Sequence, residues 1–189
     1  MSKQIVLASA SPRRHELLKE IFKDFEVDIS TKEEKKPFYV SVKNMPMYLA
    51  KQKAKDVFKR HTNDIVIGAD TIVYIDHKAL GKPKDYNDAK RMISLLSNRT
   101  HEVITGVCIM SKDNVSTFKV ISKVTFRKIT PEEIDKYCSL KTIYDKAGAY
   151  AIQGEAKDFV INVEGEYNNI VGLPTKKLKE KLKGMFRNL

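Results

Sequence analysis

The first half of the chain alternates between short apolar runs and segments whose apolar residues recur at helical spacing. Leu17, Leu18, Ile21 and Phe22 fall on one face of a helix, whereas uninterrupted apolar runs are typical of buried strands. In chain order the pattern predicts a strand at 4–9, a helix at Pro12–Phe22, a strand at 25–30, a helix at 45–61 and a strand at 64–70 that ends abruptly at Asp70. Asn44 is expected to cap the second helix.

The second half of the chain is richer in β-branched residues and predicts more antiparallel pairing. The pattern predicts a hairpin at 71–83, a helix at 86–97, a long paired stretch at 101–129 that turns at 111–114, a helix capped by Thr130, and a basic terminal helix that follows Pro174. No repeat, low-complexity tract or linker divides the sequence. We therefore expect one α/β domain over residues 1–189, with a mixed twisted sheet and flanking helices.

Composition agrees with a compact domain and excludes some classes of protein. The chain has 189 residues, 42% of them hydrophobic, which is enough to bury a core. No apolar run reaches the length of a membrane span, and the N-terminus does not have the pattern of a signal peptide. Cys108 and Cys138 form no C-x-x-C motif, so a disulfide framework is not expected. A reducing, cytoplasmic setting fits best.

The formal net charge of +11 raises the question of a nucleic-acid partner. Most of the basic residues are lysines scattered along the chain, and there is no tryptophan to stack on bases. A solvated lysine surface is therefore favoured over a dedicated nucleic-acid face. Such a surface would also attract small polyanions such as nucleotides.

The segment "SASPRR" breaks a local rule of helix formation. Ser11 suits the N-cap and Pro12 the first helical position, which places Arg13 and Arg14 in the first turn. Cations there oppose the helix dipole, at roughly 0.3–1 kcal/mol each. Together with Ser9 and the free backbone N–H groups, two guanidiniums would bind a phosphate well. The alternative is that the arginines point into water or pair with nearby acidic residues such as Glu16 and Asp24.

Carboxylates form the second candidate group. Asp70, expected at the end of a buried strand, could hold a divalent metal or take a proton from water, and it could equally be a turn residue. Glu33 and Glu34 could complete a magnesium site beside bound phosphates, or belong to a solvated loop. Lys53 and Lys82 are candidate phosphate contacts, although position alone does not single them out among the lysines.

The segment "DKAGAYAIQG" at 145–154 could pack against a flat ligand or form a tight structural turn. Gln153 carries both a donor and an acceptor, which suits recognition of a base edge. Other familiar motifs are absent from the sequence: it has no P-loop, no G-x-G-x-x-G, no G-x-S-x-G elbow and no H-E-x-x-H pair.

Taken together, these stretches resemble the Maf family of nucleoside triphosphate pyrophosphatases. The matching pieces are "LASASPRRHELL", "EE" at 33–34, "LAKQKAKDV", "VIGADTIV", "GKP", "LSNRTHEVITGV", "DKAGAYAIQG" and "VGLP". They follow the family's order and cover nearly the whole chain. The resemblance implies a mixed α/β fold like that of the inosine triphosphate pyrophosphatases, with two lobes around a central cleft.

The resemblance also implies a subgroup and a set of roles. Arg13, Thr71 and Gln153 match the branch that acts on dTTP and UTP, whose sister branch typically has tryptophan in place of Arg13. Asp70 matches the proton acceptor and a metal-side carboxylate, and Glu33 matches a second acidic residue. The residues expected to bind substrate are Ser9, Arg13, Arg14, Lys53, Thr71, Lys82 and Gln153. A divalent cation, Mg²⁺ or Mn²⁺, and a homodimer are implied as well. Ala151 departs from the family, which more often has glycine there, and could narrow the pocket.

Two rival functions differ in class from a pyrophosphatase. The first is a non-catalytic nucleotide-binding regulator of septum formation, a process to which the family has been linked. Asp70 argues against it, because a pure binder has little need for a carboxylate beside three anionic phosphates. The second is a nucleic-acid-binding module, motivated by the charge alone. Neither nucleic acid nor membrane is an expected partner. The sequence leaves open whether the cellular substrate is a normal or a modified pyrimidine nucleotide.

Overall fold

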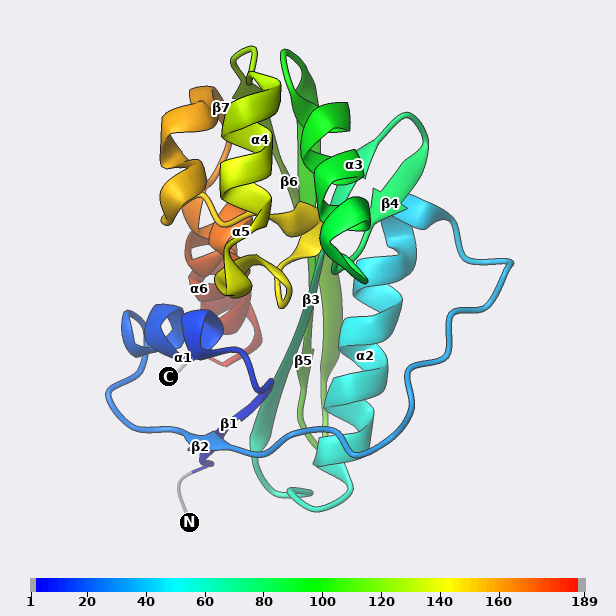
Figure 1. Cartoon of the computed structure of the whole chain (residues 1–189). Coiled ribbons are helices and arrows are strands. Elements are labelled where there is room, and N and C mark those ends of the chain that lie inside the picture. Colours follow the sequence, from blue (N-terminus) through cyan, green and yellow to red (C-terminus); the bar gives the residue numbers. More distant parts are fainter. Residues whose placement is uncertain (1–2, 187–189) are drawn as a thin grey trace. The chain divides into compact units, whose positions relative to one another are not determined.

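The computed structural model describes residues 3–186, in which strands and helices alternate as a mixed α/β protein requires (Figure 1). Paired strands follow the order β2-β1-β3-β5-β6-β7, and β4 pairs with β3, which makes a seven-stranded sheet. β1 pairs in parallel with β2 and β3, whereas β4 and β7 pair antiparallel with their neighbours. The predicted mixed sheet with flanking helices is confirmed.

The chain divides into two compact units. Unit 1 contains the described residues up to Thr71, Thr105–Val120 and those from Gly172 onward, and unit 2 contains Ile72–Ile104 and Ile121–Val171. The three long strands, β3 (Ile65–Ile75), β5 (Thr100–Met110) and β6 (Val115–Phe126), contribute residues to both units. The division into two units agrees with the expected lobes. The cleft stays a prediction.

Unit 1 is built around β1 and the N-terminal half of β3. Its other elements are α1 (Pro12–Lys19), β2 (Glu26–Val27), a 3₁₀ turn at Val42–Asn44, α2 (Met45–Phe58) and α6 (Thr175–Met185). Every residue of β1 (Ile5–Ala8) is buried, as expected for a parallel strand with neighbours on both sides. Helix α2 buries Leu49, Ala50, Ala54 and Val57 against this sheet.

Gly68 sets the close approach of α2 to β3. A side chain at this position would overlap the carbonyl oxygen of Ala50 and would lie 3.0 Å from the backbone nitrogen of Ala54. Only glycine lets the helix backbone pack this near to the strand. Gly106 on β5 likewise lets the start of α2 come close, because a side chain there would overlap the backbone of Pro46 and Met47.

Unit 2 carries the remaining elements on the other parts of β3, β5 and β6. They are β4 (Lys78–Leu80), α3 (Tyr86–Leu96), α4 (Pro131–Cys138), short 3₁₀ turns at Lys141–Ile143, Ala147–Ala149 and Glu155–Phe159, β7 (Val160–Glu164) and α5 (Tyr167–Val171). Asp76 and His77, with φ of 49° and 60°, form the two-residue hairpin between β3 and β4. The predicted N-cap Thr130 is confirmed at the start of α4, where it forms a capping box with Glu133.

Several predicted boundaries are wrong. Helix α1 ends at Lys19 rather than Phe22, because residues 20–22 tighten into a turn in which Ile21 N–H donates to Leu18 O. The strand expected at 25–30 shortens to Glu26–Val27. Asn44 stands at the N-cap of α2, but its side chain makes no cap and instead accepts a hydrogen bond from Lys119 Nζ at 2.6 Å. β7 and α5 had no counterpart in the predicted pattern.

No helix within residues 3–186 is long and apolar enough to cross a bilayer. Both cysteines, Cys108 and Cys138, are free and buried, so the expectation of no disulfide framework is confirmed. Burial raises the pKa of Cys108 to about 12 and that of Cys138 to about 11.

Candidate functional site

The first cluster of candidate residues surrounds the Arg14 guanidinium, in unit 1. Nη1 donates to Ser9 Oγ at 3.1 Å, Nη2 to Thr71 Oγ1 at 3.0 Å, and Nε to the carbonyl oxygen of Gly172 at 2.9 Å. Thr71 is itself bonded to Thr105 Oγ1 at 2.9 Å. These bonds join the loop after β1, the first turn of α1, the middle of β3, Thr105 on β5 and Gly172, which follows α5.

The local sequence places Arg14 in this position. Ser11 is the N-cap of α1, as predicted, and its hydroxyl accepts from Arg14 N–H at 3.5 Å. Pro12 occupies the first turn, and the buried Ser9 hydroxyl also accepts from Ser11 N–H at 3.3 Å. The alternative in which Arg14 points into water or pairs with Glu16 is wrong. Glu16 instead contacts His15 and Lys19.

Charge around Arg14 is balanced within the same unit. Burial lowers the pKa of the Arg14 guanidinium, and the nearby Asp70 carboxylate counters that shift. Arg13, the adjacent residue in the helix, lowers the pKa of Arg14 further, whereas Glu34 raises it. The four side chains are therefore near enough to act on one another electrostatically. Arg13 itself is half-buried in the first turn of α1.

The second cluster has Lys53 at its centre. Lys53 projects from α2, and its Nζ lies 2.7 Å from Asp70 Oδ1 and 3.0 Å from Glu34 Oε1. The Lys53 and Asp70 side chains are largely buried, at 17% and 15% exposed, whereas Glu34 is 41% exposed. One ammonium group thus bridges two carboxylates that come from different parts of the chain.

The sequence pattern predicted that a strand ends at Asp70, and this prediction is wrong. Asp70 lies in the middle of the eleven-residue strand β3, which continues through Thr71, Ile72 and Val73 because these β-branched residues extend the strand toward β4. The alternative in which Asp70 is a helix cap or a turn residue is therefore wrong as well. Its carboxylate is held by Lys53 on the neighbouring helix.

Glu34, rather than Glu33, makes the contact with Lys53. Both residues lie in the connection between β2 and α2, where residues 28–41 form neither helix nor strand (Figure 1). The residue pattern placed the two side by side in one charge run, and the family resemblance selected Glu33. The contact with Lys53 identifies Glu34. It could not be predicted from sequence, because residues 28–41 have no periodic pattern that would indicate where a side chain points.

These residues fit a hard divalent cation by the chemistry of their donors. The Asp70 and Glu34 carboxylates both contact Lys53 Nζ, and the atoms that they offer to a cation are all oxygens. Mg²⁺ is typically bound by one or two carboxylates together with substrate phosphates and water. No group of three or more His, Cys, Asp or Glu able to hold a metal occurs in the part of the chain that the structure describes. Asp70 and Glu34 could supply two carboxylates to a divalent cation whose other ligands are substrate phosphates and water.

Lys82 and Gln153 belong to unit 2, and both side chains are exposed. Lys82 follows β4, where the carbonyl of Gly81 accepts a hydrogen bond of 2.9 Å from Gly148 N–H. Gln153 lies in a turn a few residues after Gly148. Unit 2 therefore links the loops that carry these two residues.

The segment 145–154 is tied to its own unit by structural contacts. Gly148 has a φ of +69° and packs on Val73, which leaves no space for a side chain. Tyr150 is buried, and its hydroxyl lies 2.6 Å from His101 Nε2. The glycine and the tyrosine thus serve a tight turn, as one of the two interpretations of this segment predicted. The turn leaves Gln153 exposed.

Comparisons with known proteins agree with these features. The family model described as "Maf-like protein" matches residues 4–185. A protein of Bacillus cytotoxicus named dTTP/UTP pyrophosphatase is 49% identical over 181 residues, which cover 96% of this chain and 95% of that protein. A protein of the same name from Bacillus mycoides is 48% identical with the same coverage.

Among solved structures, the fold is similar to that of the Staphylococcus aureus Ham1 protein. The two structures superpose with a TM-score of 0.54 at 14% sequence identity, covering 97% of this chain and all of the other. At this identity the likeness concerns the fold alone.

Proposed function

The chain belongs to the Maf family, and from that premise we propose that it is a nucleoside triphosphate pyrophosphatase acting on dTTP and UTP. The name shared by relatives at 48–49% identity over nearly the whole chain supports this activity. The observation that carries the proposal is in unit 1, where Lys53 Nζ joins Asp70 and Glu34 at 2.7 and 3.0 Å. The neighbouring Arg14 cluster would supply the phosphate contacts.

The triphosphate is bound by cations and small polar groups. Arg14 has five N–H donors, of which Ser9, Thr71 and Gly172 take three, so two are left for phosphate oxygens. Arg13 and Lys53 add positive charge, and Lys82 is assigned a phosphate contact by its motif. Hydrogen bonds between ionised partners are roughly twice as strong as neutral ones, which favours a polyanion over a neutral ligand.

Hydrolysis needs a proton acceptor near the α-phosphorus, and Asp70 fits that role. Water attacks the α-phosphorus, the bond from that phosphorus to the bridging oxygen breaks, and pyrophosphate leaves with the bond's electron pair. Asp70 takes the proton from the attacking water. Lys53 holds the Asp70 carboxylate in place before the reaction. No covalent protein nucleophile is required.

A divalent cation, Mg²⁺ or Mn²⁺, would be held by Asp70 together with Glu33 or Glu34, and it would offset negative charge on the phosphate oxygens. Glu33 keeps its assignment from the family motif. The contact between Glu34 and Lys53 supports adding Glu34 to that carboxylate set. Arg13, Arg14 and Lys53 would stabilise the charge that develops as the bridging bond breaks.

Base selection is assigned to Arg13, Thr71 and Gln153. Gln153 would read the edge of a pyrimidine with its amide, and Thr71 is fixed by Arg14 and Thr105. We expect Arg13→Trp to lower the ratio of kcat/KM for dTTP to that for other triphosphates while leaving the unfolding midpoint nearly unchanged. An unaltered ratio would remove Arg13 from the specificity set.

The activity is tested by incubating the full chain with dTTP, UTP, dCTP, dATP and modified pyrimidine triphosphates in the presence of Mg²⁺ or Mn²⁺. We expect pyrophosphate and a nucleoside monophosphate from dTTP and UTP. In ¹⁸O-labelled water the label should enter the monophosphate, because attack occurs at the α-phosphorus. Release of inorganic phosphate instead, or label in pyrophosphate, would contradict the proposal.

The same experiment separates the enzyme from the rival regulator of septum formation. A regulator would bind dTTP without turning it over. The Asp70 carboxylate beside the phosphate-binding cations favours hydrolysis, because a site made only for binding a polyanion gains nothing from it. We further propose a cytoplasmic location, from the pattern of the two cysteines, and a homodimer, from the family resemblance.

A further inference from the structure

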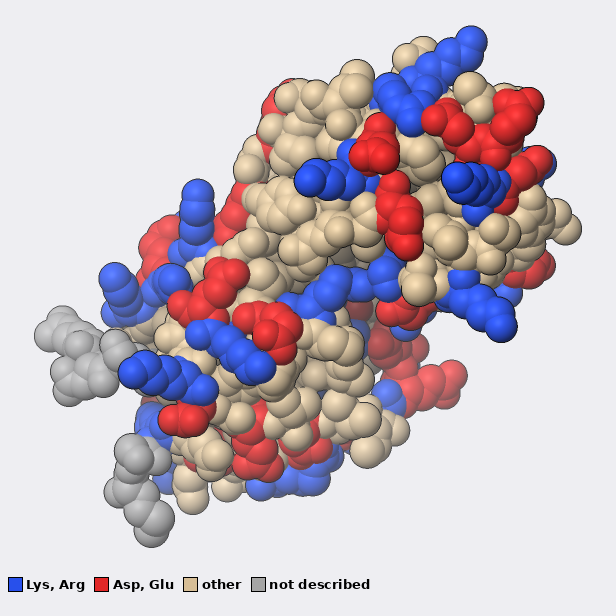
Figure 2. Space-filling model, turned by 60° about the vertical axis from the view of Figure 1, so that its left-hand side comes forward, with Lys and Arg blue, Asp and Glu red and all other residues tan. Residues whose placement is uncertain are grey.

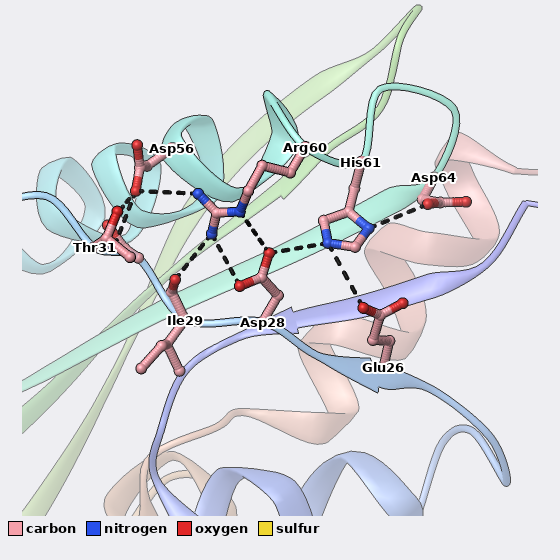
Figure 3. A network of polar contacts seen from close by, with 9 residues as sticks. Glu26, Asp28, Ile29, Thr31, Asp56, Arg60, His61 and Asp64 are labelled. Carbon is pink, nitrogen blue, oxygen red and sulfur yellow. Dashed lines mark hydrogen bonds and ion pairs between the residues drawn. The ribbon is translucent and has the colours of Figure 1, made fainter.

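The part of the connection that carries Glu33 and Glu34, residues 28–35, is held by α2 and the turn that follows it. Figure 3 shows the beginning of this contact, where Arg60 makes two bonds to the Asp28 carboxylate, at 2.8 and 2.9 Å, and a third to the carbonyl oxygen of Ile29 at 3.0 Å. His61 Nε2 lies 3.0 Å from Asp28 Oδ2. The chain leaving β2 is thus fixed before it reaches the acidic residues.

Asp56 holds the next part of the connection. Its Oδ2 accepts from Ser30 Oγ at 3.1 Å and from Thr31 N–H at 3.0 Å (Figure 3). Asp56 is only 5% exposed. Burial alone would raise the pKa of Asp56, but the bonds from Thr31 and Ser30 hold it below the usual value, so the group stays an anionic acceptor. A buried carboxylate aimed at backbone of an irregular segment fixes the course of that segment.

Gln52 holds the connection at Lys35. Its Oε1 accepts from Lys35 N–H at 3.1 Å, and its Nε2 donates to the carbonyl oxygen of Lys35 at 2.6 Å. Both polar groups of the Lys35 backbone are therefore bound by one side chain. Lys35 directly follows Glu34, whose carboxylate meets Lys53 at 3.0 Å.

The spacing of these residues on α2 explains how one helix does both tasks. Gln52 and Asp56 are four residues apart, so they share a helix face, and Arg60 extends the same row just past the last residue of the helix. Lys53 lies next to Gln52 in the chain and reaches Asp70. Helix α2 thus holds the connection through Gln52 and Asp56. It holds the Asp70 carboxylate through Lys53, the residue next to Gln52.

We propose that Gln52 and Asp56 are positioning residues, which hold Thr31–Lys35 so that Glu34 meets Lys53 beside Asp70. The inference rests on the proposed pyrophosphatase function, for which neither residue contacts the reacting groups. Gln52 and Asp56 act only through the course of the connection and the place of its carboxylates.

The first test measures the connection itself, by amide hydrogen exchange of the full chain without nucleotide. Gln52→Ala removes both bonds to Lys35, so exchange in the segment 31–36 should be faster than in the wild type. Lys55→Ala, an exposed change on the same helix, is the control and should leave the exchange unchanged. Equal exchange in all three proteins would overturn the proposal, whatever the activity.

The second test measures turnover of dTTP. We expect Gln52→Ala to lower kcat about 10-fold with a smaller change in KM, because displacement of a carboxylate affects the reacting groups more than phosphate binding. Asp56→Asn keeps an oxygen acceptor for Thr31 and should retain more activity than Asp56→Ala. The Gln52 variant keeps the test decisive if Asp56→Ala does not fold.

Combination with Glu34→Gln shows whether Gln52 acts through Glu34. The double variant should lose less kcat than the product of the two single losses, since Gln52 acts on the same stretch of chain that carries Glu34. Fully multiplicative losses would overturn the inference. An inactive wild type would refute the proposed function, whereas an active wild type with an unaffected Gln52→Ala would refute this inference alone.

Discussion

The Arg14 guanidinium makes three hydrogen bonds within unit 1, and these offset the unfavourable place of a cation at the start of a helix. Ser9, Thr71 and the Gly172 carbonyl take one N–H each, so the planar fork is fixed before any ligand arrives. The cost of a cation near the helix N-terminus is roughly 0.3–1 kcal/mol. Each hydrogen bond from a charged donor contributes about 1.5–3 kcal/mol net to stability, so the three bonds of Arg14 outweigh the cost of its place in the helix.

We therefore expect Arg14→Lys to impair the enzyme although it preserves the charge. A lysine has three N–H donors on a single nitrogen and cannot reproduce the planar fork that reaches Ser9, Thr71 and Gly172 from three nitrogens, so kcat/KM for dTTP should fall about 10-fold or more. The measurement is steady-state pyrophosphate release, compared with Arg91→Lys on the exposed surface of α3. If Arg14→Lys behaves like that control, the guanidinium geometry has no part in binding.

At the scale of elements, the approach of α2 to β3 brings Lys53 to Asp70. Gly68 allows this approach because its lack of a side chain leaves room for the backbone of Ala50 and Ala54. Gly68 thus serves the packing of α2 on β3. The same helix fixes the connection from β2 through Gln52 and Asp56.

Gly68→Ala should therefore destabilise the fold by about 2 kcal/mol, within the range for overpacked cores. The backbone of α2 must move to admit the methyl group, and activity should fall with stability. Gly184→Ala in α6 is a suitable control, because nothing lies within 4 Å of a side chain there. That control should be neutral or stabilise by about 0.5 kcal/mol. Urea unfolding measures both, and equal midpoints would contradict the packing argument.

The aromatic cluster of unit 2 predicts a pH dependence of stability. His101 is buried against Phe126 and Tyr150, and burial lowers its pKa to about 4 from an ordinary value of 6.5. Below pH 6.5 the unfolded chain binds a proton that the folded chain does not, so the stability present above pH 6.5 is lost progressively toward pH 4.

His101→Gln removes this titrating group. The free energy of unfolding should then depend less steeply on pH between 6.5 and 4 than in the wild type. Denaturant unfolding at several pH values measures the two slopes. Identical slopes would mean that His101 does not contribute to the pH dependence.

The elements could be predicted from sequence wherever a periodic pattern or a cap marked them. Thr130, Pro131 and Glu133 gave the start of α4, and the β-branched run gave β5 and β6. Side-chain hydrogen bonds rather than periodicity decide the course of residues 28–35, so the pattern extended the predicted strand to residue 30 and did not separate Glu34 from Glu33, of which the family resemblance selected Glu33. The local pattern also predicted that a strand ends at Asp70, because the continuation of β3 depends on its pairing with β4.

For the whole molecule, the formal net charge is +11, from 35 lysines and arginines against 24 aspartates and glutamates. On the face in Figure 2, lysines and arginines are interspersed with acidic side chains. A dispersed positive charge attracts a small polyanion from solution without forming a track for a nucleic acid.

The kcat/KM for dTTP should accordingly fall by roughly 3- to 10-fold when the ionic strength rises from about 0.05 to 0.3 M, since salt screens the attraction. Oligonucleotide binding, measured in parallel, should stay weak at about 0.15 M salt. Tight oligonucleotide binding with a steep salt dependence would favour the nucleic-acid module instead.

The central claim is that Asp70 takes the proton from the water that attacks the α-phosphorus. The most direct test compares pyrophosphate release from dTTP and Mg²⁺ by the wild type and by Asp70→Asn, with Asp113→Asn, an exposed turn residue, as control. We expect at least a 100-fold lower kcat for Asp70→Asn, about the lower limit for loss of a general base, with circular dichroism and dTTP binding retained. Unchanged turnover by Asp70→Asn would contradict it.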